Sequence, residues 1–346
     1  MVNCEPLEAY RQLEEAELVG CWAHVRRKFF EATPKQADKS SLGVKGLAYC
    51  DQLFSLERDW EALPADERLQ KRQEELQPLM EDFFAWCRRQ SVLAGSKLGR
   101  AIEYSLKYKE TFKTILKDGH LVLSNNLAER AIKSLVMGRK NWLFSQSFEG
   151  AKARAIIMSL LETAKRHQLN SEKYLSYLLE CLPNEETLVN KEVLEASDKI
   201  VKAPIPKAPL AYSLGSASII AHTIHQKFNL KVPNYRQEED WAKIGLPITR
   251  KEIANWHIKA SQYYLESLYN LLREKLLEQA LLHADETSYR VLESDSQLTY
   301  YCTFLSGKSE KQGITLYHHD QRRSGLVVQE FLGDYSGYVH CDMLRQ

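Results

Sequence analysis

The sequence lacks an excess of charge of either sign. Its 346 residues include 47 Lys and Arg against 46 Asp and Glu, which gives a formal net charge of +1. A protein that attracts nucleic acid through its overall charge is therefore excluded, and any DNA-binding surface must be a local patch. The length and the 44% hydrophobic content are typical of a globular protein of about two or three domains.

Closely spaced pairs of cysteines are missing, and so are long apolar runs. The seven Cys residues are odd in number and scattered, and none forms a CxxC pair, which argues against a disulfide framework or a structural zinc site. We find no signal peptide, and no apolar run approaches the ~20 residues of a membrane span. We therefore expect a cytoplasmic protein with no membrane partner.

Helical periodicity dominates the first 280 residues, and two segments interrupt it besides a hairpin or loop at 118–126. One is an apolar, aromatic stretch over 17–23, which predicts a strand. The other is the Pro-rich segment 183–212, which we interpret as a linker. Helices are predicted at 5–16, 24–32, throughout 42–118, 147–169, 171–182, 216–228, 233–243 and 246–279, with a hairpin or loop at 118–126.

The C-terminal stretch has a different pattern. Segments 280–287, 297–306 and 313–319 are apolar or rich in Thr and Tyr, as strands are, and a helix over 322–335 precedes a further short strand at 337–342. Three strands, a helix and a strand make up the front half of an α/β sheet domain.

Asp285 and Asp342 occur in similar local sequences. Each is expected to end a short strand, and each follows a His by two residues. In open α/β sheets, sites lie beyond the carboxyl ends of the strands, and carboxylates there suit Mg²⁺ or Mn²⁺. The alternative is that both are ordinary strand-end or turn residues, as Asp often is. Glu286 faces the opposite way from Asp285, so only one of the two can join such a site.

Glu129 is an acid near the start of a basic helix. It could close a capping box with Asn126, or it could be a metal-binding carboxylate set in a surface that holds a phosphate backbone. The second interpretation would assign phosphate contacts to the basic residues that follow it, Arg130, Lys133, Arg139 and Lys140.

Two other basic segments could either contact DNA or have an ordinary structural role. Arg26, Arg27 and Lys28 either approach phosphates or form a solvated helix face. The segment "ITRKEIANW", with Arg250 and Lys251, has the rhythm of a helix-turn-helix DNA reader, although such pairs more often simply pack. Cys21 and His24 are at best half of a zinc site, and a structural role for Cys21 is the more common outcome.

Taken together, several motifs resemble the insertion sequence 66 family of DDE transposases over nearly the whole chain. They include "LLHADETSYRVL", "YVHCD", "GCWAHVRRKFFEA", "SNNLAERAIKSLVMGRKNWLF" and "SASIIAHTIHQKF". The resemblance implies an RNase H-like mixed α/β core with a large all-helical insertion. It also implies a catalytic triad of Asp285, Asp342 and Glu129 that holds two Mg²⁺ or Mn²⁺ ions. The protein would act on DNA as a homo-oligomer.

The sequence departs from the family in the order of its parts. The segment resembling 200–342 comes first in the family and the segment resembling 10–195 follows, so this chain looks circularly permuted. A coiled-coil and Cys-rich segment that members usually carry before the Pro-rich stretch is not found. The expected division is core 1–34, helical insertion 35–118, Glu-bearing core helices 119–182, linker 183–212, a helical and DNA-contacting region 213–279, and core 280–346.

The sequence therefore predicts a DNA transposase that cleaves and joins phosphodiesters at the ends of an insertion element. A non-transposing RNase H-like nuclease and an inactive remnant that only binds DNA are the alternatives. Metal-dependent strand cleavage and the joining of a cut end to target DNA would separate the three.

Overall fold

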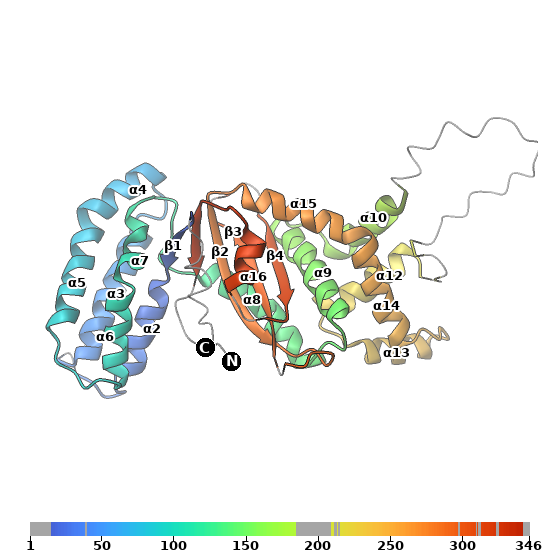
Figure 1. The fold of residues 1–346 in the computed structure, drawn as a ribbon, viewed down its shortest axis with the longest axis horizontal. Coiled ribbons are helices and arrows are strands. Elements are labelled where there is room, and N and C mark those ends of the chain that lie inside the picture. Colours follow the sequence, from blue (N-terminus) through green and yellow to red (C-terminus); the bar gives the residue numbers. More distant parts are fainter. Residues whose placement is uncertain are drawn as a thin grey trace, which may run out of the picture.

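The computed structural model describes residues 15–38, 40–184, 209–210, 213, 215–296, 298–308, 310, 313–322 and 325–341. Figure 1 shows a sheet flanked by two groups of helices, α2 to α7 beyond β1 and α9 to α15 beyond β4. Most of the helix expected over 5–16 and of the linker expected over 183–212 lies outside the described residues. So do Asp342 and the two ends of the chain, which we expect to lie near one another.

One five-stranded mixed sheet joins the two ends of the sequence. Its strands are β1 (Glu17–Gly20), β2 (Leu281–Tyr289), β3 (Thr299–Ser306), β4 (Thr315–Asp320) and β5 (Tyr338–Cys341). The order is β1-β5-β2-β3-β4, with β1, β5 and β2 parallel and β3 and β4 antiparallel to their neighbours. The prediction that the strand near 17 shares a sheet with the strands near 280 and 340 is confirmed.

The strand expected over 17–23 is shorter than predicted. β1 ends at Gly20, and helix α2 (Trp22–Ala32) begins two residues later. The Trp22 backbone N–H bonds to the carbonyl of Leu123 at 2.8 Å, and its indole N–H bonds to the carbonyl of Phe112 at 3.1 Å. The aromatic character that suggested a strand therefore reflects burial at a helix start, because Trp22 is fully buried.

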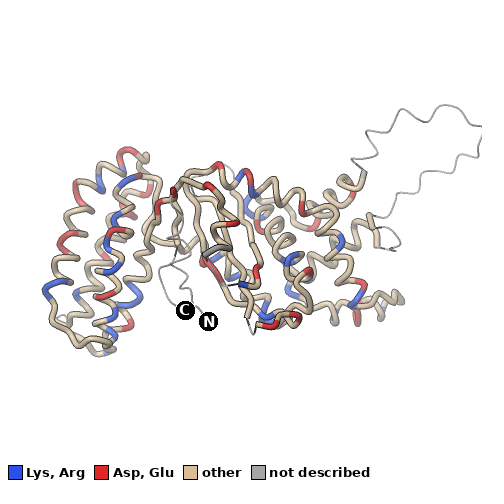
Figure 2. The backbone as a smooth tube through the Cα atoms, in the orientation of Figure 1, with Lys and Arg blue, Asp and Glu red and all other residues tan. Residues whose placement is uncertain are grey.

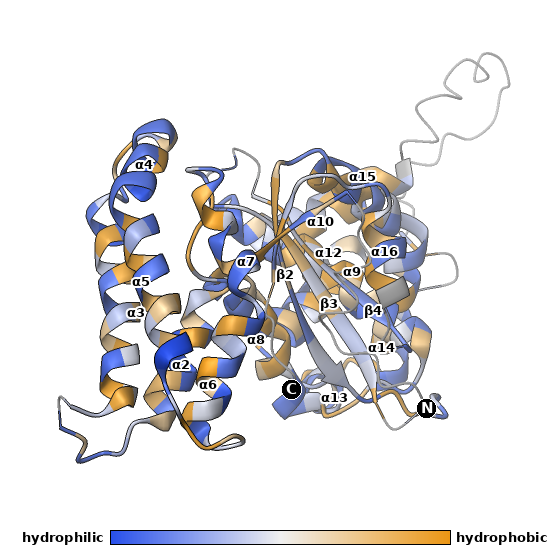
Figure 3. Ribbon diagram, turned by 60° about the vertical axis from the view of Figure 1, so that its left-hand side comes forward, coloured by the Kyte–Doolittle hydropathy of each residue, from blue (hydrophilic) through white to orange (hydrophobic). Residues whose placement is uncertain are grey.

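The prediction of helices throughout 42–118 is confirmed, since this segment contains no strand and all of it is described. Figure 3 shows apolar and polar residues alternating along these helices. Their inner faces form an aromatic core in which Trp22 packs on Phe83, Phe84 and Phe112 with ring centroids 5.3–5.8 Å apart. The helices are α3 (Leu42–Asp59), α4 (Ala65–Lys71), a π-helical turn (Arg72–Leu76), α5 (Gln77–Arg89), α6 (Lys97–Lys107), α7 (Lys109–Lys113) and a 3₁₀ turn (Thr114–Leu116).

A close approach at Gly20 joins this helical group to the sheet. A Cβ at Gly20 would lie 2.5 Å from the Phe112 ring, so a side chain there would push the ring out of the core. The helical group therefore packs directly against the edge strand β1, which covers that edge of the sheet.

A buried guanidinium organises the turn that leads back to the sheet. Arg72 forms a bidentate ion pair with Glu57, at 2.6 and 2.7 Å. Its remaining N–H groups bond to the carbonyls of Ile115, Asp118 and Leu121 at 2.7–3.1 Å. The fork geometry of arginine suits this many acceptors, and the loop after α7 is thereby held against α4 and the π-helical turn.

The remaining helices cover the two faces of the sheet and the edge formed by β4. They are α8 (Asn126–Trp142), α9 (Phe148–Arg166), α10 (Ser171–Cys181), α12 (Ala217–Ile224), a π-helical turn (His225–Asn229), α13 (Asn234–Lys243), α14 (Arg250–Ala260), a second π-helical turn (Ser261–Leu265), α15 (Glu266–Leu277) and α16 (Gly325–Leu332). Within the described residues, no helix is long and apolar enough to cross a membrane.

Helix α9 covers the outer edge of β4. The backbone N–H groups of Thr315 and Tyr317 bond to the hydroxyls of Thr163 and Ser159, at 3.0 and 2.7 Å. Side chains of the helix thus satisfy donors that an edge strand would otherwise leave open.

The two faces of the sheet are covered by different helices. The Tyr317 hydroxyl donates to the Ala131 carbonyl of α8 at 2.7 Å, which places α8 on the face that carries Tyr317. On the opposite face, the Phe304 ring stacks on Phe331 of α16, with centroids 4.1 Å apart. Because paired residues of neighbouring strands share a face, these contacts show which helix each position of the sheet meets.

Candidate active site between β2 and α8

A buried asparagine fastens the start of α8 to the middle of β2. The Asn125 side chain donates to the Ala284 carbonyl at 2.8 Å, and its oxygen lies 2.9 Å from His283 Nδ1. Its backbone N–H donates to the Cys21 sulfur at 3.2 Å. One residue therefore ties the first turn of α8 to the strand next to Asp285 and to the start of α2.

Asp285 lies on the face of the sheet that α8 covers. It pairs with Thr303 of β3, which in turn pairs with Tyr317 of β4, the residue whose hydroxyl contacts α8. His283 is two residues earlier and shares this face, as predicted, while Glu286 faces the other way. Asp285 Oδ1 also accepts from the Glu286 backbone N–H at 2.8 Å.

The expectation that Asp285 ends its strand is wrong. β2 continues to Tyr289, because Thr287 and Tyr289 extend the antiparallel ladder with β3. On its other side, the described part of β5 pairs with β2 as far as His283. Asp285 therefore lies in mid-strand, four residues before the end of β2.

Glu129 lies in the first turn of α8, and its side chain points toward α2. The capping-box interpretation is wrong, because the N-cap residue is Asn125 and no side chain caps this helix start. Glu129 Oε1 lies 3.7 Å from His24 Nε2, and Oε2 lies 3.6 Å from the Arg27 guanidinium. Within the described chain, Oε1 is among the buried side-chain oxygens that accept no hydrogen bond.

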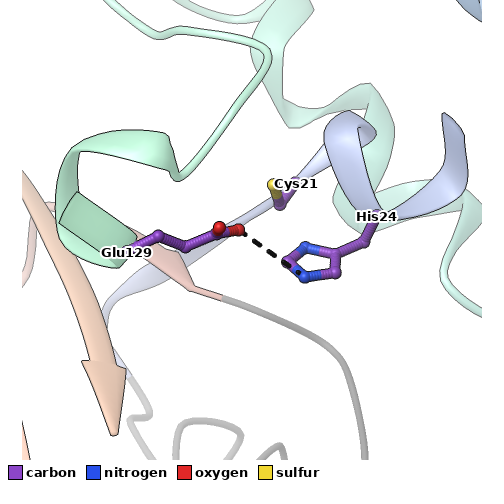
Figure 4. A group of neighbouring side chains, drawn as sticks. All are labelled: Cys21, His24 and Glu129. Atoms are coloured by element: carbon purple, nitrogen blue, oxygen red, sulfur yellow. Dashed lines mark ion pairs between the residues drawn. The ribbon is translucent and has the colours of Figure 1, made fainter. Parts of the chain in front are cut away.

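Cys21, His24 and Glu129 form a compact group at the junction of β1, α2 and α8 (Figure 4). Their sulfur, ring nitrogen and carboxylate oxygen all lie within 4.8 Å of one another, and no other such trio of His, Cys, Asp or Glu ligand atoms occurs among the described residues. Sequence reasoning treated Cys21 and His24 apart from Glu129. The three-residue spacing of the first two was visible, but the third member comes from a distant part of the chain.

Two buried histidines lie beneath the site. The rings of His283 and His340 stack with centroids 5.0 Å apart. Burial, with a smaller contribution from Arg166, lowers the pKa of His283 to about 4, and burial also holds the pKa of His340 well below its ordinary value. Because the Asn125 amide group donates to Ala284, its oxygen accepts from His283, which places a proton on His283 Nδ1.

Asp342, the third predicted carboxylate, lies outside the described residues, which end at Cys341. The strand before it, β5, lies in the sheet between β1 and β2, because His340 pairs with His283 on one side and with Val19 on the other. The prediction that all three carboxylates converge stays a prediction.

The basic residues at the start of α2 have partners in the protein. Arg26 pairs with Asp51 at 2.7 Å in an exposed ion pair. The Lys28 ammonium lies 4.8 Å from the centre of the Tyr104 ring, and burial lowers its pKa. Arg27 is half exposed, and its guanidinium approaches the Glu129 carboxylate.

The basic residues of α8 divide into two sets. Arg130, Lys133 and Lys140 are exposed. Arg139 is partly buried and donates to the Ser288 carbonyl, so it holds α8 against β2. Figure 2 shows that basic and acidic residues are interspersed along the helices, so a phosphate-binding surface here would be local.

The turn-helix pattern at Arg250 and Lys251 is present as a capped helix. Thr249 and Glu252 form a capping box at the start of α14, and α13 precedes this turn. Arg250 and Lys251 are exposed, and Arg250 lies 3.7 Å from Glu238. Their proposed contact with DNA stays a prediction.

The family profile described as "Transposase IS66 family" matches residues 1–153 and 213–345. The chain belongs to this family of transposases.

Curated relatives come from Sinorhizobium fredii (strain NBRC 101917 / NGR234). The chain is 34% identical to the "Uncharacterized protein y4hP" over 171 residues, which is 46% of this chain and 31% of the relative. It is 32% identical to y4qI over 168 residues, 48% of this chain and 31% of that one, and 27% identical to y4jD over 176 residues, 50% and 34%. Each alignment therefore spans about a third of the relative. No solved structure shows a significant match.

Proposed function

We propose that this chain acts as a DDE-type DNA transposase, which cleaves a phosphodiester at an element end and joins the released 3′-hydroxyl to target DNA. Asp285, Asp342 and Glu129 are its catalytic carboxylates in this proposal. The observation that carries it is the attachment of α8 to β2 through Asn125, since this puts the helix bearing Glu129 against the strand and the face that bear Asp285.

The three carboxylates of the proposed site are of the type that binds a hard divalent ion. Carboxylate oxygens are the ligands that Mg²⁺ and Mn²⁺ prefer, and Glu129 Oε1 is a buried carboxylate oxygen that accepts no hydrogen bond from the described residues. Two such ions, held by Asp285, Asp342 and Glu129, would activate the attacking oxygen and stabilise the leaving one. The role of the protein is to position these carboxylates, and Asn125 and Arg139 do this by fixing α8 on β2.

The proposal includes an RNase H-like core in circularly permuted order. The pairing within the sheet supports it, because β1, near the start of the described residues, pairs in parallel with β5, near their end. Helices 42–118 would be the insertion beside this core. A permuted chain keeps the order of strands in space while changing their order in sequence, and sheets tolerate this when the new ends are exposed.

DNA is the proposed partner, and the exposed face of α8 is its proposed contact. Arg130, Lys133 and Lys140 are exposed to solvent on the helix that carries Glu129, where a phosphate backbone could reach them. Phosphate contacts of this kind position a duplex but do not read its sequence. A homo-oligomer on DNA stays a prediction.

The test is strand cleavage of a duplex that carries the ends of the encoding element, in the presence of Mg²⁺ or Mn²⁺. Glu129→Gln, Asp285→Asn and Asp342→Asn should each abolish cleavage while retaining DNA binding. Glu149→Gln is a matched control, because Glu149 is an exposed acid in the first turn of the next helix. Glu286→Gln tests the choice between the two adjacent acids of β2. Full activity of Glu129→Gln would refute the site.

The same assay separates the alternatives. Cleavage without joining of the cut end to target DNA would indicate a non-transposing nuclease. DNA binding without metal-dependent cleavage by the wild-type chain would indicate a remnant that only binds DNA.

A further inference from the structure

We propose that Cys21, His24 and Glu129 form a binding site for a soft or borderline divalent ion of the Zn²⁺ class. Its ligands are the Cys21 sulfur, His24 Nε2 and Glu129 Oε1, and a fourth position is left for water or another oxygen ligand. The site differs in chemistry from the hard-ion site proposed above, with which it shares one carboxylate.

The spacing of the ligand atoms fits such an ion. His24 Nε2 and Glu129 Oε1 are 3.7 Å apart, and the three ligand atoms all lie within 4.8 Å of one another. Zinc bonds of ~2.0–2.3 Å in tetrahedral geometry place ligands ~3.3–3.8 Å apart. A small rotation of the Glu129 side chain, which is 29% exposed, would close the remaining gap.

The scaffold holds two of the ligands in place before an ion arrives. Cys21 is the N-cap residue of α2, and His24 lies on the first turn, so their side chains project to the same side. Both are buried. The Cys21 sulfur accepts the Asn125 backbone N–H at 3.2 Å, and hydrogen bonds of this kind orient and stabilise a metal-bound thiolate.

Soft and hard ions should be distinguished by this donor set. Thiolate and imidazole ligands favour Zn²⁺ over Mg²⁺, whereas a carboxylate serves either. An ion held by Cys21 and His24 would bind Glu129 through Oε1 and so compete for this carboxylate with the proposed hard-ion site. We therefore expect Zn²⁺ to oppose Mg²⁺-dependent cleavage; this consequence rests on the proposed function, but the binding of the ion does not.

Binding is measured on the full chain without DNA, so the result does not depend on activity. Co²⁺ serves as the spectroscopic probe, because a cobalt–thiolate bond gives a charge-transfer band, and Zn²⁺ affinity follows from competition with Co²⁺. Wild type should bind one ion with this band. Cys21→Ser should lose the band. His24→Gln and Glu129→Gln should each weaken Zn²⁺ binding by at least ~100-fold, which is more than the loss of a residue that only hydrogen-bonds to a metal ligand usually costs.

Two controls keep the test decisive. Cys181→Ser removes a partly exposed thiol on α10 and should leave the band and the affinity unchanged. If Cys21→Ser fails to fold, judged by circular dichroism, Glu129→Gln carries the test, because its side chain is partly exposed and an amide replaces it with little change of shape. Equal Zn²⁺ affinity of wild type, His24→Gln and Glu129→Gln would overturn the proposal.

The outcomes also separate this proposal from the proposed function. Zinc binding that depends on the three ligands, in a chain that never cleaves DNA, would leave the ion site standing and remove the transposase assignment. Cleavage that requires Glu129, with no ligand-dependent zinc binding, would do the reverse.

Discussion

Replacement of Asn125 by Ala tests the connection on which the candidate site depends. Asn125 is fully buried, and its side chain makes two hydrogen bonds across a gap of more than 150 residues, to the Ala284 carbonyl and to His283 Nδ1. It makes no capping bond to α8. The substitution therefore removes the attachment of α8 to β2 and leaves the helix cap unchanged.

The expected cost follows from the groups left behind. The Ala284 carbonyl and the His283 N–H would each lose a buried partner, and an unsatisfied buried group costs about 1–3 kcal/mol. Partial relaxation or entry of water would reduce this, so we expect Asn125→Ala to lower the free energy of unfolding by about 2–4 kcal/mol. Asn126→Ala is the matched control, since Asn126 is the exposed neighbour and should change stability by less than about 0.5 kcal/mol.

The assay combines urea unfolding with amide hydrogen exchange. A chain of this size need not unfold in one step, so exchange of the amides of β2 and the first turns of α8 identifies where stability is lost. Faster exchange in these two segments, with little change in α3 to α6, is the expected pattern. If Asn125→Ala and Asn126→Ala are equally stable and exchange alike, the attachment does not hold the site together and the reasoning is refuted.

Further predictions concern buried charges and DNA. Arg72→Ala should destabilise the chain by about 3–5 kcal/mol, because it leaves Glu57 without its buried partner, whereas the adjacent Lys71→Ala, which breaks an exposed pair, should cost under about 1 kcal/mol; equal effects in urea unfolding would contradict this. Burial, aided by Arg154, lowers the pKa of Lys227 to about 7, so the unfolded chain binds more protons between about pH 7 and 10.5 and stability should rise with pH across that window. Lys227→Met should flatten this rise and add about 1–2 kcal/mol at pH 7, less than the full pKa shift implies because the side chain is partly exposed; an unchanged pH profile of thermal unfolding would count against it. DNA affinity should fall steeply with added salt, as released counterions require, and a flat dependence would argue against phosphate contacts.

The sequence by itself determined most of the secondary structure, because hydrophobic periodicity is a local property. Helices throughout 42–118 follow from apolar residues at helical spacing, and the strands near 280–341 follow from alternation and β-branched or aromatic content. Where local signals conflicted, the prediction was wrong. Trp22 looked like part of a strand because it is apolar, but its bonds to Leu123 and Phe112 belong to a helix start. Motif similarity also led to the family, which the profile match confirms.

Only the tertiary structure decided which of these elements meet. Cys21 and Asn125 are 104 residues apart in sequence, and Asn125 and Ala284 are 159 apart, yet hydrogen bonds join all three at one junction. No periodicity encodes such contacts, because they depend on how whole elements pack. The contacts of Glu129 were equally hidden from the sequence. Its position in the chain suggested a helix cap, but in the fold its side chain lies beside His24. A residue's neighbours in sequence set its conformation, whereas the chemistry available to its side chain is set by segments that only folding brings near.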